Sequence, residues 1–241
     1  MVTENAIILA AGQGSRLLPI TEHMPKCLIE INSTTILENA LNNLSSAGVK
    51  NVYVVVGYMA DLIREKIGNI YLGMSIFYIE NPQFSITNNM VSLMLGIEPC
   101  KGPAWIIESD IFFDSTILDR HYGKYDMLWY VDSQRKDLDG AYIIAESGGR
   151  AKDLEIVRDV SLLKQNHHKS IGILWVNQTG LPKIFEWLKE GVEHNKTNLF
   201  YDLILAEHIM EINIHINDVN PSKWFEIDTE EDLKNARKNF L

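Results

Sequence analysis

The sequence predicts an α/β fold whose sheet is largely parallel in the first half of the chain. Short runs of apolar and β-branched residues alternate there with segments of helical periodicity. Strands that alternate with helices pair in parallel through right-handed crossovers. The first apolar run also passes directly into a loop of small residues, and ligands of such sheets bind beyond the carboxyl ends of the strands. These observations place the expected binding site at that edge of the sheet.

The elements of the first half are predicted from their residue patterns. Residues 52–56 are β-branched or aromatic throughout, which is typical of a strand buried on both faces. Residues 36–47 have amphipathic helical spacing and end at Gly48, a natural C-cap. By the same criteria we expect further strands at residues 6–9, 75–79 and 105–108, and further helices at residues 60–67 and 90–96.

After residue 120 the pattern changes to strands with looser connections, partly antiparallel. The expected strands are residues 127–131, 140–145, 170–176 and 213–219, and the expected helices are residues 182–193, 201–210 and 230–240. The sequence contains no internal repeat, low-complexity tract or separating linker. We therefore expect a single domain, residues 1–241, whose second half completes the sheet.

The bulk composition argues against several classes of protein. The chain has 241 residues and a formal net charge of −10, which disfavours a broad nucleic-acid-binding surface. Its two cysteines, Cys27 and Cys100, lack metal-like spacing, so both are expected to be reduced thiols. No apolar stretch approaches the ~18 residues that span a bilayer, and the N-terminus lacks the basic region of a signal peptide. The expectation is a cytoplasmic protein that binds neither nucleic acid nor membranes.

The most informative segment runs from residue 6 to residue 28. A strand leads into the loop Ala10-Ala11-Gly12-Gln13-Gly14-Ser15, which is followed by Arg16 and later by the pair Pro25-Lys26. Such a loop lets backbone N–H groups approach phosphate oxygens, whose charge nearby cations neutralise. A dinucleotide-binding fingerprint is excluded because its third glycine would fall at Leu17, and the Gly-Lys-Ser/Thr of a Walker A loop is absent.

This segment resembles the signature of the nucleotidyltransferases that activate sugar phosphates and small phospho-alcohols. Their pattern is roughly L-A-A-G-x-G-[ST]-R-[LM]-x-P-x-T-x-x-x-P-K, and residues 9–17, Pro19, Thr21 and Pro25-Lys26 match it. The resemblance implies a Rossmann-like three-layer sandwich with a mixed, mostly parallel sheet. It also implies a nucleotide-binding half, residues 1–120, and an acceptor-binding half, residues 121–241.

In this family an acceptor oxygen attacks the α-phosphorus of a nucleotide while pyrophosphate departs, so positioning and charge neutralisation dominate catalysis. The resemblance implies that Arg16 holds the β- and γ-phosphates and that Lys26 bridges the α-phosphate and the acceptor phosphate. For each of them the alternative is a solvated surface charge. The residues expected to bind the nucleotide are Leu9, Ala10, Ala11, Gly12, Gly14, Ser15, Asn81, Asn88 and Asn89.

Two aspartates are the candidate ligands for Mg²⁺, which prefers oxygen ligands. Asp110 follows the apolar run 105–108 and matches the aspartate after the family's central strand. Asp228 lies in the segment Trp224-Phe225-Glu226-Ile227-Asp228-Thr229, which matches the family's W-x-[DE]-[IV]-D-[TS] pattern. Alternatively, Asp228 or Thr229 caps the terminal helix.

The segment of residues 81–93, NPQFSITNNMVSL, indicates the substrate class. Sugar nucleotidyltransferases carry a glycine-rich stretch here, whereas this chain has Thr87-Asn88-Asn89 followed by Ser92-Leu93. That pattern resembles the bacterial cytidylyltransferases that act on phosphocholine, 2-aminoethylphosphonate and related phospho-amines. Amide side chains both donate and accept hydrogen bonds, which suits a pyrimidine edge or phosphate oxygens. For Asn88 and Asn89 the alternative is a helix N-cap region.

An aromatic cage is one predicted mode of acceptor recognition. A quaternary ammonium group binds aromatic faces by cation–π attraction. The candidates in the second half are Trp129, Tyr130, Trp175 and Tyr201, with core packing as the alternative for each. Gly172 would admit close approach of the acceptor.

Carboxylates are the second predicted mode, because they would bind a primary amine. Asp132, Asp202 and Glu226 are available, and Glu226 alternates with the candidate metal ligand two residues on. Many relatives place a basic residue near the strand of residues 140–144, which is apolar here. Either Lys152 replaces that phosphate contact or the acceptor of this chain differs from that of those relatives.

The resulting hypothesis is a Mg²⁺-dependent cytidylyltransferase that transfers CMP from CTP to a small phospho-amine or phosphonate and releases pyrophosphate. One alternative is a sugar-1-phosphate or polyol-phosphate nucleotidyltransferase, against which Thr87-Asn88-Asn89 argues. The other is a non-catalytic nucleotide-sensing module, against which four residues argue: Arg16, Lys26, Asp110 and Asp228. A homodimer is compatible with the sequence but not required by it.

Overall fold

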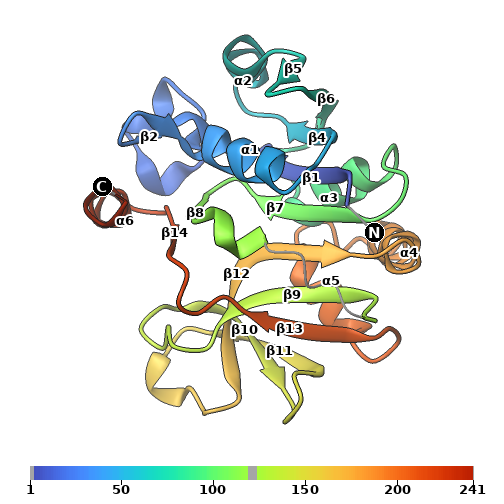
Figure 1. The fold of residues 1–241 in the computed structure, drawn as a ribbon. Helices are drawn as coiled ribbons and strands as arrows, with labels where there is room; N and C mark the ends of the chain where they lie inside the picture. Colours follow the sequence, from blue (N-terminus) through green and yellow to red (C-terminus); the bar gives the residue numbers. More distant parts are fainter. Residues whose placement is uncertain (1–2, 119–123, 241) are drawn as a thin grey trace.

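A computed structural model describes residues 3–118 and 124–240. Its centre is a ten-stranded mixed sheet in the order β11-β10-β12-β7-β1-β4-β6-β5, in which β9 pairs with β12 and β13 pairs with β9 (Figure 1). The α/β class and the mixed sheet predicted from the sequence are confirmed. Parallel pairing occurs in the first half and between β9 and β13, and the remaining pairs are antiparallel.

The parallel part of the sheet positions the edge where ligands are expected. Its neighbouring strands all run in one direction, so that their carboxyl ends meet along one edge. They are β6 (Met74–Glu80), β4 (Asn51–Val56), β1 (Asn5–Ala10) and β7 (Ala104–Glu108). The glycine loop follows β1 at this edge, and Asp110 follows β7.

The long strand β12 (His167–Val176) joins this part to the antiparallel part by pairing with β7, β9 and β10. It begins before residue 170, the predicted start, so Lys169 lies within the strand. The other strands of the sheet are β5 (Ile70–Tyr71), β9 (Met127–Asp132), β10 (Gly140–Ala145), β11 (Ala151–Val157) and β13 (Ile214–Asp218).

Strand β11 was not predicted from the sequence, and its burial pattern explains why. Ala151, Leu154 and Val157 are buried, whereas the residues between them are exposed. This spacing of three departs from the strict alternation that identifies a half-buried strand. The strand forms through its antiparallel pairing with β10 at the end of the sheet.

Helices cover both faces of the sheet and give three layers (Figure 1). Along β1, Ala6, Ile8 and Ala10 belong to one core with helices α1 (Ile36–Ser46) and α2 (Ala60–Ile67). Ile7 and Leu9 of the same strand belong to a second core. The helices of that second core are α3 (Asn89–Ile97), α4 (Gly180–Glu193) and α5 (Tyr201–Glu207). Within the described ranges, no helix has both the length and the apolar character to cross a membrane.

A small two-stranded sheet brings the end of the chain to the same edge. Strand β8 (Ile111–Phe113) pairs antiparallel with β14 (Trp224–Glu226). Just beyond this pair, the backbone N–H of Ile227 donates a hydrogen bond of 2.9 Å to the carbonyl of Asp110. Helix α6 (Glu230–Asn239) follows. The hairpin of β2 (Glu30–Ile31) and β3 (Thr34–Thr35) lies beside it, and the Arg237 guanidinium donates to the Glu30 carbonyl at 2.9 Å.

Candidate active site

Two adjoining cavities open at the carboxyl edge of the parallel strands. The first, the glycine-loop cavity, has a volume of about 280 Å³. Every residue predicted to bind the nucleotide lines it: Leu9, Ala10, Ala11, Gly12, Gly14, Ser15, Asn81, Asn88 and Asn89. The second, the distal cavity, has a volume of about 370 Å³ and shares Arg16, Asp110 and Asp228 with the first.

The conformation of the glycine loop explains two residues of the motif. Gly14 has a φ of +64°, in the left-handed region that favours glycine. A Cβ atom there would lie 2.9 Å from Cβ of Lys26. The carbonyl of Gly14 accepts a hydrogen bond of 3.0 Å from the Thr21 hydroxyl. At Gly12 a Cβ would meet no atom within 4 Å, so open space lies beside this part of the loop.

Lys26 lies between the two predicted metal ligands. Its Nζ atom is 2.9 Å from Oδ2 of Asp110 and 2.6 Å from Oδ1 of Asp228. Burial opposes the charged ammonium, but the two carboxylates outweigh burial and hold the pKa of Lys26 above its ordinary value. Arg16 contacts the other oxygen of Asp228 at 2.7 Å, and its side chain is 69% exposed at the cavity mouth. Neither cation is therefore an isolated surface charge.

Three acidic side chains fit a divalent cation. Ligand oxygens of Asp110, Glu226 and Asp228 lie within 4.8 Å of one another. Oδ1 of Asp110 is buried and has no hydrogen-bond partner among the described residues, which is the state expected of an atom reserved for a ligand. An all-oxygen donor set is the kind that Mg²⁺ binds in proteins.

The competing interpretation of Asp228 as a helix cap is resolved by the structure. Thr229 is the N-cap of α6, and its hydroxyl accepts a hydrogen bond of 3.2 Å from the backbone N–H of Asp232. The Asp232 carboxylate completes the capping box by accepting from the Thr229 N–H at 2.8 Å. The carboxylate of Asp228 is therefore left for the cluster.

The three asparagines of the glycine-loop cavity hold its wall together. Asn88 is the N-cap of α3, as the alternative interpretation predicted, and its Oδ1 accepts from the Asn89 N–H at 2.8 Å. Oδ1 of Asn89 accepts from the Tyr201 N–H at 2.9 Å, which ties α3 to α5. Asn81 donates to the Ser92 hydroxyl at 3.0 Å. Direct contacts of these amides with a nucleotide remain a prediction.

The acceptor residues predicted from the sequence divide into two groups. Gly172, Tyr201 and Glu226 line the distal cavity. Trp129 and Trp175 do not, so the prediction that they form a cage there is wrong. Trp129 belongs to the core on one face of the sheet and Trp175 to the core on the other. Successive side chains of a strand point to opposite faces, so the position of each tryptophan along its strand determines its face.

Hydrogen bonds show where these indoles are held. The Trp129 N–H donates to the Ser170 hydroxyl at 2.9 Å inside the core. The Trp175 N–H donates to the Thr3 hydroxyl at 2.7 Å, near the start of the chain. Asp132 is likewise structural, since its Oδ2 accepts from the Trp224 indole at 2.8 Å.

Sequence reasoning missed two cations of the distal cavity, the exposed Arg158 and the buried Lys169. Lys169 lines this cavity and is only 4% exposed. Lys152, the residue considered for a phosphate contact, instead forms an ion pair with Glu146 outside both cavities. In the sequence, Lys169 directly precedes the apolar run 170–176. It lines the cavity because β12 begins before that run and includes Lys169.

Carboxylic acids dominate the rest of the distal cavity. Burial raises the pKa of Asp202 to about 6. Burial, reinforced by the negative charges of Asp110 and Asp202, also raises the pKa of Glu108 well above its ordinary value. The Tyr201 hydroxyl is hydrogen-bonded to Glu108. These buried acids favour a cationic group in the cavity, because a cation would compensate their charge.

Gly172 allows strand β12 to pass these acids. Its φ is +71°, and a Cβ atom there would lie 3.0 Å from Oε2 of Glu108. The β12 register also shifts between Ser170 and Leu174, as at a β-bulge. The predicted close approach at Gly172 is thus made by the protein's own carboxylate.

Comparisons with known proteins agree with this geometry. The chain is 26% identical over 238 residues to the 2-aminoethylphosphonate cytidylyltransferase of Lancefieldella rimae, covering 95% of this chain and 90% of that protein. It is 38% identical over 119 residues to a CMP-5'-(3-aminopropyl)phosphonate synthase of Streptomyces rubellomurinus, covering 49% of this chain and only 19% of that protein.

The fold is shared with solved structures as well. The CTP:phosphocholine cytidylyltransferase of Streptococcus pneumoniae matches with a TM-score of 0.78 at 20% sequence identity, over 100% of both chains. The profile of the nucleotidyl transferase family matches residues 5–138, more than half of the chain. The family predicted from the glycine loop and its flanking cations is therefore confirmed: this chain belongs to the nucleotidyl transferase family.

Proposed function

We propose that this nucleotidyltransferase is a Mg²⁺-dependent cytidylyltransferase that transfers CMP from CTP to a small phospho-amine or phosphonate and releases pyrophosphate. The observation that carries the proposal is that Asp110 and Asp228 line both cavities and that Lys26, in the glycine-loop cavity, contacts both carboxylates. A nucleotide in the glycine-loop cavity and an acceptor in the distal cavity would meet at these carboxylates. The cytidylyltransferases among the relatives support the choice of CTP.

The chain's own residues supply most of what the transfer needs. Residues 1–120 would hold the triphosphate through the backbone of the glycine loop and through Arg16 at its mouth. Lys26 would neutralise charge where the acceptor oxygen attacks the α-phosphorus, in line with the departing pyrophosphate. Mg²⁺, held by Asp110 and Asp228 with Glu226 adjacent, would supply further charge neutralisation on the phosphates.

Residues 121–241 would bind the acceptor amine. Asp202 and Glu226 line the distal cavity, and both are partly buried. A primary ammonium donates three hydrogen bonds, which suits a cavity lined by carboxylates. With Trp129 and Trp175 in the core, Tyr201 and Phe200 are the aromatic residues left to line the distal cavity. We therefore rank primary amines above quaternary amines as acceptors.

The test is pyrophosphate release with Mg²⁺ and either CTP or UTP across a panel of acceptors. The panel comprises 2-aminoethylphosphonate, phosphoethanolamine, phosphocholine, glycerol phosphate and sugar-1-phosphates. CTP-dependent release with a phospho-amine or phosphonate is the expected result. Release only with UTP and a sugar-1-phosphate would replace the proposal with a sugar nucleotidyltransferase. Nucleotide binding without release from any acceptor would favour a sensing module.

Acceptor use is expected to fall in acid because of Asp202. Its pKa of about 6 means that the carboxylate needed to bind an ammonium is protonated below that pH. The kcat/KM for the amine acceptor, measured at saturating CTP, should therefore decrease as pH falls through about 6. The variant Asp202→Asn should lose this acidic limb and lower kcat/KM at pH 8 by about tenfold, as expected for a lost charged hydrogen bond.

A stability measurement provides the control for this variant. Because the folded pKa of Asp202 is raised from 3.8 to about 6, the folded state disfavours its ionised form. The wild type should therefore lose stability relative to Asp202→Asn as pH rises through that interval, measured by thermal unfolding. An unchanged acidic limb in Asp202→Asn would assign the limb to another group.

A further inference from the structure

Lys169 is a buried ammonium that the structure provides with little compensation. Its residue is 4% exposed on β12, beside Tyr142 of β10. Its Nζ atom lies over Gly140, where a Cβ would be only 2.9 Å away. Gly140 has a φ of +112°, so no other residue type occupies this position without strain. The space for the ammonium is thus built into the backbone.

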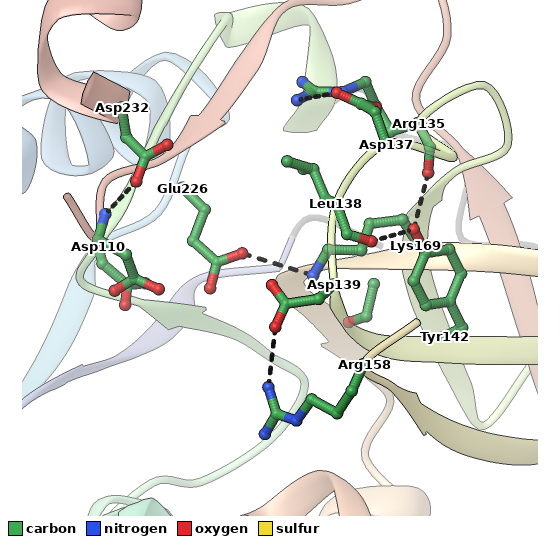
Figure 2. A network of polar contacts seen from close by, with 12 residues as sticks. Asp110, Arg135, Asp137, Leu138, Asp139, Tyr142, Arg158, Lys169, Glu226 and Asp232 are labelled. Atoms are coloured by element: carbon green, nitrogen blue, oxygen red, sulfur yellow. Dashed lines mark hydrogen bonds and ion pairs between the residues drawn. The ribbon is translucent and has the colours of Figure 1, made fainter. Parts of the chain in front are cut away.

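Among the described residues, Lys169 forms one hydrogen-bonded ion pair with another side chain, and the Asp202 carboxylate attracts it electrostatically as well. Nζ lies 3.4 Å from Oε2 of Glu226, and Figure 2 shows the two groups facing one another. An ammonium carries three N–H donors, and burying it without partners is costly. At least two donors are therefore available for an anion that enters the distal cavity, which Lys169 lines.

The position of Lys169 indicates which anion this is. Glu226 links Lys169 directly to the acidic cluster, whose ligand oxygens lie within 4.8 Å of one another. The ammonium therefore lies on the distal-cavity side of the centre where the transfer would occur. An anionic group bound there is next to the reacting atoms, as the nucleophilic phosphoryl group of an acceptor must be.

Other cations near the distal cavity are less suited to this role. Arg158 is 71% exposed, and its guanidinium pairs with Asp139 at 3.1 Å at the cavity rim (Figure 2). Lys152 lies outside the cavity and pairs with Glu146. Of the three, Lys169 alone is buried.

We propose that Lys169 binds the tetrahedral oxyanion of the acceptor, a phosphate or a phosphonate, and orients it for attack on the nucleotide. The role of Lys169 in the reaction rests on the proposed function. The binding of an anion by Lys169 does not. Glu226 holds the ammonium in place between acceptors, and Gly140 keeps the space above it free.

Lys169→Met is the direct test, with Lys152→Met as the matched control. We expect the acceptor KM to rise about 10- to 100-fold in Lys169→Met, as for a lost charge-assisted hydrogen bond, while the KM for CTP is unchanged. Lys169→Arg should restore most of the acceptor affinity, and Lys152→Met should match the wild type. Equal increases in both KM values, or no increase for the acceptor, would overturn the assignment.

Comparison of two acceptors identifies the group that Lys169 binds. Phosphoethanolamine and O-phosphoserine share the phosphoryl group, and only the second carries a carboxylate. Equal losses with both acceptors support the phosphoryl assignment. A loss confined to O-phosphoserine would assign Lys169 to a distal carboxylate and refute the proposal.

A binding measurement separates this proposal from the proposed reaction. Calorimetric titration of methylphosphonate into the wild type and Lys169→Met needs no turnover. Weaker binding in the variant supports the anion site even if no acceptor reacts, whereas equal binding refutes it. If Lys169→Met does not fold, as judged by thermal unfolding, Lys169→Gln provides the same comparison with a polar side chain of similar length.

Discussion

Replacing Asp110 by asparagine is expected to abolish nucleotidyl transfer while leaving the fold intact. The substitution removes one carboxylate from the acidic cluster but almost no volume. The amide oxygen can still accept the hydrogen bond that Lys26 now donates at 2.9 Å. If Asp110 is the charged metal ligand that we propose, its loss should lower kcat by about 10³-fold. The measurement is pyrophosphate release at saturating CTP, Mg²⁺ and acceptor.

Asp61→Asn is the matched control, because the Asp61 side chain is fully exposed and its ion pair is with Arg64 on the same helix, α2. It should retain wild-type rates and stability. A second readout is the increase in melting temperature on addition of Mg²⁺, which should be smaller in Asp110→Asn than in the wild type. Near-normal turnover in Asp110→Asn would remove Asp110 from the set of metal ligands.

Lys26→Met is expected to lose both activity and stability. Without the ammonium, Asp110 and Asp228 face one another across a buried site with no cation between them. Breaking such a pair costs about 3 kcal/mol, because the charge of Asp110 loses its partner while Asp228 keeps its ion pair with the exposed Arg16. The kcat should fall by about 10³-fold, since the same ammonium is the one we propose to neutralise charge during the transfer.

Divalent cation distinguishes this variant from one that is merely misfolded. Mg²⁺ should raise the melting temperature of Lys26→Met more than that of the wild type, because the cation replaces the missing charge between the two aspartates. Turnover should remain low, because the ammonium on the transferring phosphate is still absent. Lys66→Met is the control, as Lys66 lies on α2 and pairs with Glu38 at 3.5 Å. Wild-type turnover in Lys26→Met would contradict the role assigned to Lys26.

Local sequence was sufficient to predict the nucleotide side of the site. The glycine loop directly follows the apolar strand β1. Thr21, whose hydroxyl donates to the Gly14 carbonyl, follows seven residues after Gly14. Short-range backbone geometry therefore fixes their arrangement. The position of Lys26 could also be predicted, because its Cβ lies against Gly14. Close packing between the loop and the lysine therefore accounts for their fixed spacing in the motif.

Local sequence was insufficient wherever the face of a strand or its pairing decided the outcome. Trp129 and Trp175 carry the right chemistry for a cage, but the faces on which they lie are buried under helices and neighbouring strands. Strand β11 has no alternating pattern and depends on β10 for its hydrogen bonds. The residue pattern of one strand does not show which helices cover its faces or which strand pairs with it.

By itself, then, the sequence determined the α/β class, the family and the nucleotide loop, because each depends on residues that are close together in the chain. Only the tertiary structure decided the acceptor side. Pairing of β8 with β14 places Asp228 beside Asp110, and pairing of β12 with β10 places Lys169 over Gly140. These contacts join residues far apart in sequence, and whether a charge is buried and compensated there depends on every element packed around it.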